Sequence, residues 1–206
     1  SEVIGSLAFS GVLWRCQQCE LIFKDPQYFL NYSEQKTRYD HHRNSIDDPG
    51  YVQTFMPILS ATNELIDKKH GLQNSDFLVL DWGAGPVPVL SQLFQQKMNL
   101  QIDIYDPVYS PQLPQRKYDL ITCTEVVEHM TDPLAELQKI DQYLNSGGVL
   151  LGMTNFYPQN NFRKWWYVRD LTHVIFFCEK TFHWLAEYFA WQVLQLQSPL
   201  FELKKK

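Results

Sequence analysis

The sequence has no long apolar run and little positive charge. None of its hydrophobic segments approaches the ~20 residues that a membrane-spanning helix needs, so we expect no membrane partner. Lys and Arg total 18 against 23 Asp and Glu, and this balance argues against nucleic acid as a partner. The N-terminus lacks a signal-peptide pattern, and the cysteines are too scattered for a disulfide framework. We therefore expect a cytoplasmic protein in which Lys204–Lys206 form a solvated tail.

The sequence also lacks a partner for its closely spaced cysteine pair. Cys16 and Cys19 lie within short β-type runs, as in one knuckle of a zinc ribbon. A structural zinc ion needs four ligands, and no second cysteine pair or histidine pair lies nearby in the sequence. We therefore predict that residues 1–30 form a partial zinc-ribbon-like appendage with two reduced cysteines and no metal.

A glycine turn at residues 83–85 is the most informative feature that the sequence does contain. The apolar run at residues 77–80 predicts a buried strand before the turn, and apolar residues at helical spacing follow it. A second strand is predicted to end at Asp106, about twenty residues further on, where an acid meets a ribose in nucleotide-binding units. Val87 replaces a third glycine and the two prolines beside it have no N–H, so the loop is poorly suited to a pyrophosphate.

Three segments, taken together, resemble a known enzyme family. The Asp-x-Gly-x-Gly at residues 81–85, followed by Asp106, resembles the cofactor motif of class I S-adenosylmethionine-dependent methyltransferases. Residues 123–130 resemble the Glu-x-x-Glu-His segment of small-molecule methyltransferases, including the quinone-biosynthesis O-methyltransferases. Residues 133–154 resemble the helix, Gly-Gly turn and strand that precede and form the family's fifth strand. The cysteine pair is similar to the zinc ribbon that precedes this domain in some bacterial relatives.

The resemblance implies a Rossmann-like α/β fold, a three-layer αβα sandwich whose mostly parallel sheet has one antiparallel strand near the C-terminus. It implies a methyltransferase domain over residues 31–206, in which residues 31–70 form a helical lid or cap. The cofactor would be S-adenosyl-L-methionine, and the acceptor a small molecule methylated at oxygen or carbon. The residues expected to bind the cofactor are Asp81, Gly83, Gly85, Asp106, Cys123, Thr124 and Tyr39.

Glu125, Glu128 and His129 are the predicted catalytic groups. At i, i+3 and i+4 of a helical turn they would share one face. From there they could orient the acceptor, remove its proton or hold a divalent ion, and in the quinone enzymes this trio is associated with a metal. The alternative is structural: the glutamates meet backbone amides at a helix start and the histidine packs in the crevice. His173 is a further candidate for a substrate contact or acid–base group, or for a buried structural residue.

Three other segments bear on the site. The segment after Asp106 is short and rich in proline, so a strand and helix typical of the family are expected to be missing. Their loss would change the contacts to the adenine of the cofactor. Residues 38–45 are predicted to form a lid or a pocket wall, with a solvated helix face as the alternative. The aromatic residues within 155–170 could line a pocket or fill the core.

Two other functions fit parts of the sequence. An NAD-dependent oxidoreductase would use the same strand–turn–helix unit, but Val87 and the adjacent prolines weaken it. A non-catalytic domain that keeps the fold as an interaction or cofactor-binding module accounts for the incomplete cysteine knuckle and the short segment after Asp106.

Overall fold

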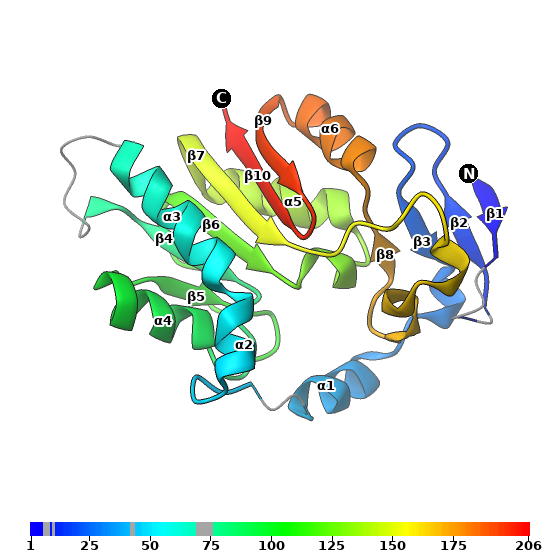
Figure 1. Cartoon of the computed structure of the whole chain (residues 1–206), viewed down its shortest axis with the longest axis horizontal. Coiled ribbons are helices and arrows are strands. Elements are labelled where there is room, and N and C mark those ends of the chain that lie inside the picture. The colour runs from blue at the N-terminus through cyan, green and yellow to red at the C-terminus, as the bar shows by residue number, and fades with distance from the viewer. Residues whose placement is uncertain (6–8, 10, 42–43, 69–75) are drawn as a thin grey trace.

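A six-stranded sheet forms the centre of the protein (Figure 1). The computed structural model describes residues 1–5, 9, 11–41, 44–68 and 76–206. The strands lie in the order β5-β4-β6-β7-β10-β9. Their bounds are β4 (Val79–Trp82), β5 (Asp103–Tyr105), β6 (Tyr118–Thr124), β7 (Leu144–Met153), β9 (Trp191–Gln197) and β10 (Leu200–Lys205). Strands β4 to β7 pair in parallel, whereas β10 runs antiparallel to both β7 and β9, as the predicted fold requires.

The C-terminal lysines belong to this antiparallel strand. Lys204 pairs with Val149 of β7, and Lys205 pairs with Trp191 of β9. The Lys205 ammonium also lies 2.9 Å from an Asp141 carboxylate oxygen and donates to the Asp141 carbonyl. The prediction of a solvated tail is therefore wrong for these two lysines, because backbone pairing and an ion pair hold them.

Helices cover both faces of the sheet and complete the three predicted layers. Buried side chains of adjacent residues alternate between two cores: Leu120 and Leu151 pack with α3 and α4, while Ile121 and Leu150 pack with α5 and α6. This alternation is expected for strands buried on both faces. The helices have the bounds α1 (Tyr32–Asp40), α2 (Pro49–Thr54), α3 (Met56–Lys68), α4 (Val89–Met98), α5 (Pro133–Tyr143) and α6 (Glu179–Tyr188).

Local signals set several helix ends. The Asp132 carboxylate accepts from the Ala135 N–H at the start of α5, and Asn99 ends α4 in the left-handed conformation. Residues 49–68 form two helices, because helical hydrogen bonding breaks at Phe55 and Pro57 falls in the first turn of α3. Helix α5 passes directly into β7, so the Gly147-Gly148 turn predicted between them lies inside the strand.

A smaller sheet ties the N-terminal residues to the rest of the chain. Its order is β1-β2-β3-β8, and its fourth strand comes from the C-terminal half. The strands are β1 (Glu2–Ile4), β2 (Leu13–Arg15), β3 (Ile22–Lys24) and β8 (Ile175–Phe176). Ile22 pairs with Phe176, and both share a core with Tyr167. The described part of residues 1–30 therefore shares its core with the C-terminal half, and the predicted boundary at residue 30 stays a prediction.

The remaining turns are short. Between β5 and β6, residues 106–117 contain no helix or strand, which confirms the predicted loss of a strand and helix there. Single 3-10 turns occur at η1 (Pro26–Tyr28), η3 (Val127–His129), η4 (Phe162–Lys164) and η5 (Trp166–Arg169).

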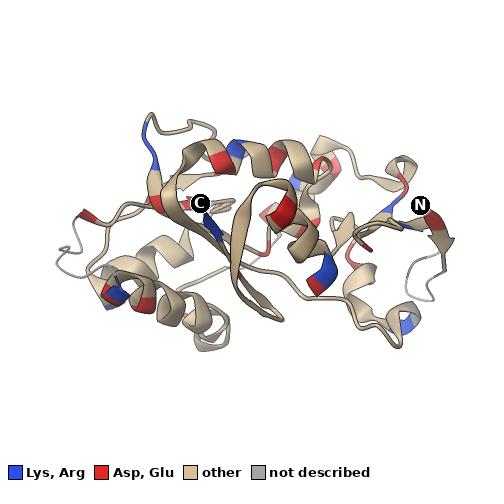
Figure 2. Cartoon of the chain, turned by 90° about the horizontal axis from the view of Figure 1, so that it is seen from above, with Lys and Arg blue, Asp and Glu red and all other residues tan. Residues whose placement is uncertain are grey.

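Acidic and basic residues are distributed over both sheets and their helices (Figure 2). In the described part of the chain, no helix is long and apolar enough to cross a membrane.

Candidate functional site

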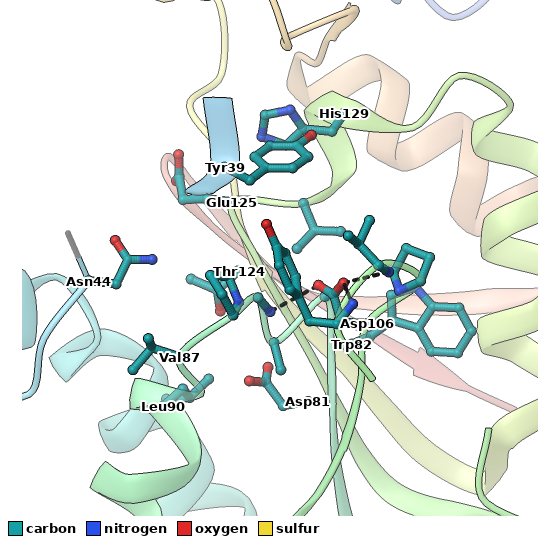
Figure 3. Close-up of a pocket in the computed structure, with 18 of the residues that line it drawn as sticks. Tyr39, Asn44, Asp81, Trp82, Val87, Leu90, Asp106, Thr124, Glu125 and His129 are labelled. Carbon is teal, nitrogen blue, oxygen red and sulfur yellow. Dashed lines mark hydrogen bonds between the residues drawn. The ribbon is translucent and has the colours of Figure 1, made fainter. Parts of the chain in front are cut away.

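A cavity of about 550 Å³ lies at the carboxyl ends of β4, β5 and β6 (Figure 3). Its volume falls within the about 300–1,000 Å³ typical of small-molecule sites. The carboxyl edge of a parallel sheet is where such folds bind ligands, because the connecting loops diverge there. The predicted site residues that line the cavity are Tyr39, Asp81, Gly83, Gly85, Asp106, Thr124, Glu125, His129 and His173.

The glycine turn needs glycine at both positions because of its backbone angles, and at Gly83 also because of close packing. Gly83 has φ +82°, and a Cβ atom there would lie 2.4 Å from a methyl carbon of Val126. Gly85 has φ +70° with open space around its Cα hydrogens. Both angles lie in the left-handed region that L side chains avoid. The turn therefore brings bare backbone to the cavity at Gly85 and packs closely at Gly83.

Asp106 fastens the glycine turn to the loop that follows β5. One of its carboxylate oxygens accepts from the Gly85 N–H at 2.9 Å. The other accepts from the N–H groups of Val108 and Tyr109, at 2.8 and 3.0 Å. A carboxylate has about four acceptor positions, so these three bonds leave room for one more donor from a ligand.

Asp81 is a buried carboxyl at the floor of the cavity. It is 4% exposed and accepts a 2.8 Å hydrogen bond from the Thr122 hydroxyl. Burial raises its pKa to about 6, the Thr122 bond opposes that shift, and the nearby charge of Asp106 adds to it. The side chain therefore favours a cationic partner, which would restore its ionised form.

The last two residues of β6 differ in where their side chains lie. The structure corrects the prediction for Cys123, which is fully buried in the core with Leu80 and Leu150 and does not line the cavity. Successive side chains of a strand point to opposite faces, so Thr124 faces the cavity instead. Its hydroxyl oxygen is buried and has no hydrogen-bond partner in the described structure.

Glu125 and Glu128 meet at the hydroxyl of Tyr167. Glu125 Oε2 lies 3.0 Å from that hydroxyl, which also contacts Glu128 Oε1. A phenol has a single proton, so one of the two carboxyls must itself be protonated to satisfy both contacts. Burial, followed by the charge of Glu128, raises the pKa of Glu125 to about 8, and burial raises the pKa of Glu128. The pair thus shares a proton near neutral pH.

The predicted regular helical turn through these residues is wrong. Glu125 has φ +53°, and a 3-10 turn begins only at Val127. As a result Glu128 is fully buried behind Tyr167 and does not line the cavity, whereas Glu125 and His129 do. The structure therefore gives Glu128 no direct contact with a ligand in the cavity, contrary to a shared catalytic face.

His129 and His173 form a neighbouring imidazole pair, with ring centroids 4.9 Å apart. His129 Nδ1 lies 3.0 Å from the Thr172 carbonyl, and His173 Nδ1 lies 3.0 Å from the Tyr167 carbonyl. A carbonyl only accepts, so both Nδ1 atoms carry the proton and both Nε2 atoms present a lone pair. Burial lowers the pKa of His129, and burial with the charge of His129 lowers the pKa of His173 to about 4. Both rings are therefore neutral bases at pH 7.

The donor atoms that could hold a metal ion belong to Glu128, His129 and His173. Within the described residues, they form the one group of three such side chains whose ligand atoms all lie within 4.8 Å of one another. Glu128 Oε2 is buried without a hydrogen-bond partner. Carboxylate and imidazole ligands suit a divalent transition-metal ion, so the donor set fits one. His173 takes the place that the sequence assigned to Glu125.

The loop that carries His173 adds Asp170, which was not among the predicted site residues. Asp170 lines the cavity, accepts from the N–H and hydroxyl of Thr172, and faces Arg38 of α1. These hydrogen bonds lower its pKa to about 2 against the opposing effect of burial. Lys24 of β3 is fully buried and donates to the Asp170 carbonyl at 2.7 Å. The smaller sheet therefore supports the loop that carries His173 and that offers the Thr172 carbonyl to His129.

The aromatic stretch before this loop serves both of the predicted purposes. Trp166 and Tyr167 line the cavity, and Trp166 is 61% exposed at its rim. Tyr157 and Phe162 lie in the core under the smaller sheet. Part of the segment predicted as a lid, residues 42–43, lies outside the described residues, but Tyr39 packs edge-on against the His129 ring.

The cysteine pair lies away from the cavity, in the turn between β2 and β3. The Cys16 N–H donates to the Leu21 carbonyl, and Glu20 closes the turn with φ +61°. Both cysteines are free, and Cys19 is buried, which raises its pKa to about 11. That these two cysteines are reduced and bind no metal stays a prediction.

Comparison with known proteins identifies similar chains. A family model described as "Methyltransferase domain" matches residues 52–196. The Ubiquinone biosynthesis O-methyltransferase of Acinetobacter baumannii (strain AYE) is 29% identical over 92 residues, which cover 43% of this chain. The match spans only 38% of that relative's length.

Two solved structures are similar over most of this chain. The plantazolicin methyltransferase BpumL in complex with a triazolic desmethylPZN analog and SAH has a TM-score of 0.53 at 11% identity, covering 87% of this chain and 94% of its own. Magnesium protoporphyrin IX methyltransferase (ChlM) from Synechocystis PCC 6803 with bound SAM has a TM-score of 0.49 at 14% identity, with the same coverage. At this identity the likeness to BpumL concerns the fold.

Proposed function

The chain belongs to the methyltransferase domain family, and on this basis we propose that it transfers a methyl group from S-adenosyl-L-methionine to a small-molecule acceptor, at oxygen or carbon. One observation carries the proposal. The glycine turn, two acidic strand ends and two neutral imidazoles come from distant parts of the sequence and line one cavity of suitable volume. The similar structure of BpumL contains SAH, which supports this choice of cofactor.

The cofactor end of the cavity is assigned to the glycine turn and the two aspartates. S-adenosyl-L-methionine supplies a methyl group already activated by its positively charged sulfur. Asp106 would accept from one ribose hydroxyl at its remaining acceptor position. Asp81, a buried acid with a raised pKa, would hold the positively charged amino end. The bare backbone at Gly85 leaves room for the ligand to lie against the turn.

The acceptor end of the cavity is assigned to the two histidines. His129 presents a neutral Nε2 lone pair and would remove the proton of an acceptor hydroxyl, a contribution of about 10²–10⁴ in rate. His173 would orient the same hydroxyl or its neighbour. Positioning the acceptor in line with the methyl group can supply about 7–11 kcal/mol of barrier lowering. Tyr39 and Trp166 would exclude water from this end.

A divalent ion would use these same histidines as ligands, in place of the free-base role of His129. Glu128, His129 and His173 would hold it, and it would supply positive charge that lowers the pKa of a bound acceptor hydroxyl. Chelator treatment tests this directly. Loss of turnover that returns with added metal would support the ion, and unchanged turnover would leave His129 as a free base.

Calorimetry with S-adenosylhomocysteine tests the proposed function. The wild-type chain should bind it, and Asp106→Ala should bind at least about tenfold more weakly because a hydrogen bond to a charged group contributes roughly 1.5–3 kcal/mol. Binding of NADH without S-adenosylhomocysteine would overturn the proposal in favour of an oxidoreductase. A folded chain that binds neither would favour an interaction module. A cytoplasmic location and the absence of a nucleic-acid partner rest on charge and composition and remain proposals.

A further inference from the structure

The short loop after β5 holds one aromatic residue in a fixed position at the cavity wall. Asp106 and Ser110 exchange two backbone hydrogen bonds of 3.0 Å, which close the loop. The Asp106 carboxylate also accepts from the Val108 and Tyr109 N–H groups inside it. Tyr109 lines the cavity from this loop. Its backbone is therefore as firmly placed as Asp106 itself.

Tyr109 also connects this loop to helix α1. Its hydroxyl donates to an Asp40 carboxylate oxygen at 2.6 Å, at the last residue of the helix. Lys36, one turn earlier, pairs with the same carboxylate at 2.7 Å and lies 5.4 Å from the Tyr109 ring centre. Two residues of α1 thus converge on one side chain of the loop.

Helix α1 contacts the rest of the described chain through its last turns. It contains no buried residue, so no apolar face fixes it to the sheet. Besides the contacts at Tyr109, it makes a 3.5 Å ion pair between the partly exposed Arg38 and Asp170, and its Tyr39 ring packs edge-on against His129. Surface ion pairs of this kind contribute little. The bond between Tyr109 and Asp40 therefore helps to hold α1, together with the packing of Tyr39 on His129.

We propose that Tyr109 takes over part of the wall that a third strand and its helix would provide, and that its bond to Asp40 latches α1 over the adenosine end of the bound cofactor. The Asp106 carboxylate joins this latch to the glycine turn, because it binds Gly85 on one side and the Tyr109 loop on the other. A planar base lying against a tyrosine ring gains stacking energy. The inference rests on the proposed function, since it presumes that the cavity takes an adenosine ligand.

The test measures S-adenosylhomocysteine affinity and its dissociation rate. Tyr109→Phe, which keeps the ring, and Asp40→Ala should each weaken binding about three- to tenfold, mainly through faster dissociation. The double variant should bind no more weakly than the worse single variant, because both changes break the same bond. Tyr109→Ala should lose more than Tyr109→Phe, because the ring is lost as well.

Tyr32→Phe is the matched control, since Tyr32 lies on the same helix and is 65% exposed. It should bind like the wild type, and all variants should keep the wild-type melting temperature. A wild-type chain that binds S-adenosylhomocysteine while Tyr109→Phe and Asp40→Ala bind equally well would overturn the latch alone. Additive losses in the double variant would also overturn it. A wild-type chain that does not bind would instead overturn the proposed function.

Discussion

Replacing Asp81 with asparagine should make the ligand-free protein more stable and the bound complex weaker. The carboxyl is 4% exposed, and one hydroxyl, that of Thr122, donates to it. Asparagine keeps an oxygen that can accept the same bond, so the change mainly removes a buried charge. Because burial is the cause of the raised pKa, removing the charge relieves the cost of burial.

The magnitude follows from the shift in pKa. The pKa rises from 3.8 to about 6, or about 2 units, and each unit corresponds to about 1.36 kcal/mol. Between these two values the folded state binds more protons than the unfolded state, so stability falls as pH rises through the window. The free energy of unfolding of Asp81→Asn should therefore exceed that of the wild type by up to about 3 kcal/mol at pH 8. Near pH 4 to 5 the difference should be much smaller.

Urea unfolding at pH 5 and pH 8 measures this difference, and calorimetry measures S-adenosylhomocysteine affinity on the same samples. We expect at least about tenfold weaker binding, because a charge-assisted bond to the ligand's amino group is lost. Asp67→Asn, an exposed carboxylate on α3, serves as the control and should change stability by less than about 0.5 kcal/mol at both pH values. A wild type as stable as Asp81→Asn at pH 8 would refute the reasoning.

Four further substitutions test other parts of the site and core. Gly85→Ala should lower the free energy of unfolding by about 1–2 kcal/mol from its positive φ alone. Gly83→Ala should lower it more and should bind S-adenosylhomocysteine more weakly, because its new methyl group also meets Val126. Equal losses of the two variants in urea unfolding would contradict this. Gly152→Ala should lower the melting temperature markedly, since a Cβ there would lie 2.5 Å from a backbone carbonyl, and a near-wild-type melting curve would show that β7 can shift. His129→Gln should reduce turnover by about 10²-fold or more with cofactor affinity retained, and a lower melting temperature with turnover retained would assign the histidine a structural role.

Local features of the sequence were enough to predict the centre of the fold. The strand before Gly83 and the helix after Gly85 follow from apolar periodicity and from the need for glycine at positive φ, which neighbouring residues alone decide. The missing strand after Asp106 was predictable for the same reason, since prolines prevent it wherever the segment lies. Both acidic strand ends reach the cavity because parallel strands finish at one edge of a sheet.

The tertiary structure alone decided which side chains meet. His129 and His173 are 44 positions apart in the sequence (173 − 129). Their contact depends on the loop that carries His173, which Lys24 of β3 supports from the other end of the chain. Tyr167 meets Glu125 because the smaller sheet packs its aromatic segment inward, and Glu128 is buried by the same packing. Hydrophobic periodicity reports which face of an element is apolar, but it contains no information about which distant element will cover that face. The partners of a buried polar side chain are therefore set by long-range packing, whose energy is spread over many small contacts rather than over a local motif.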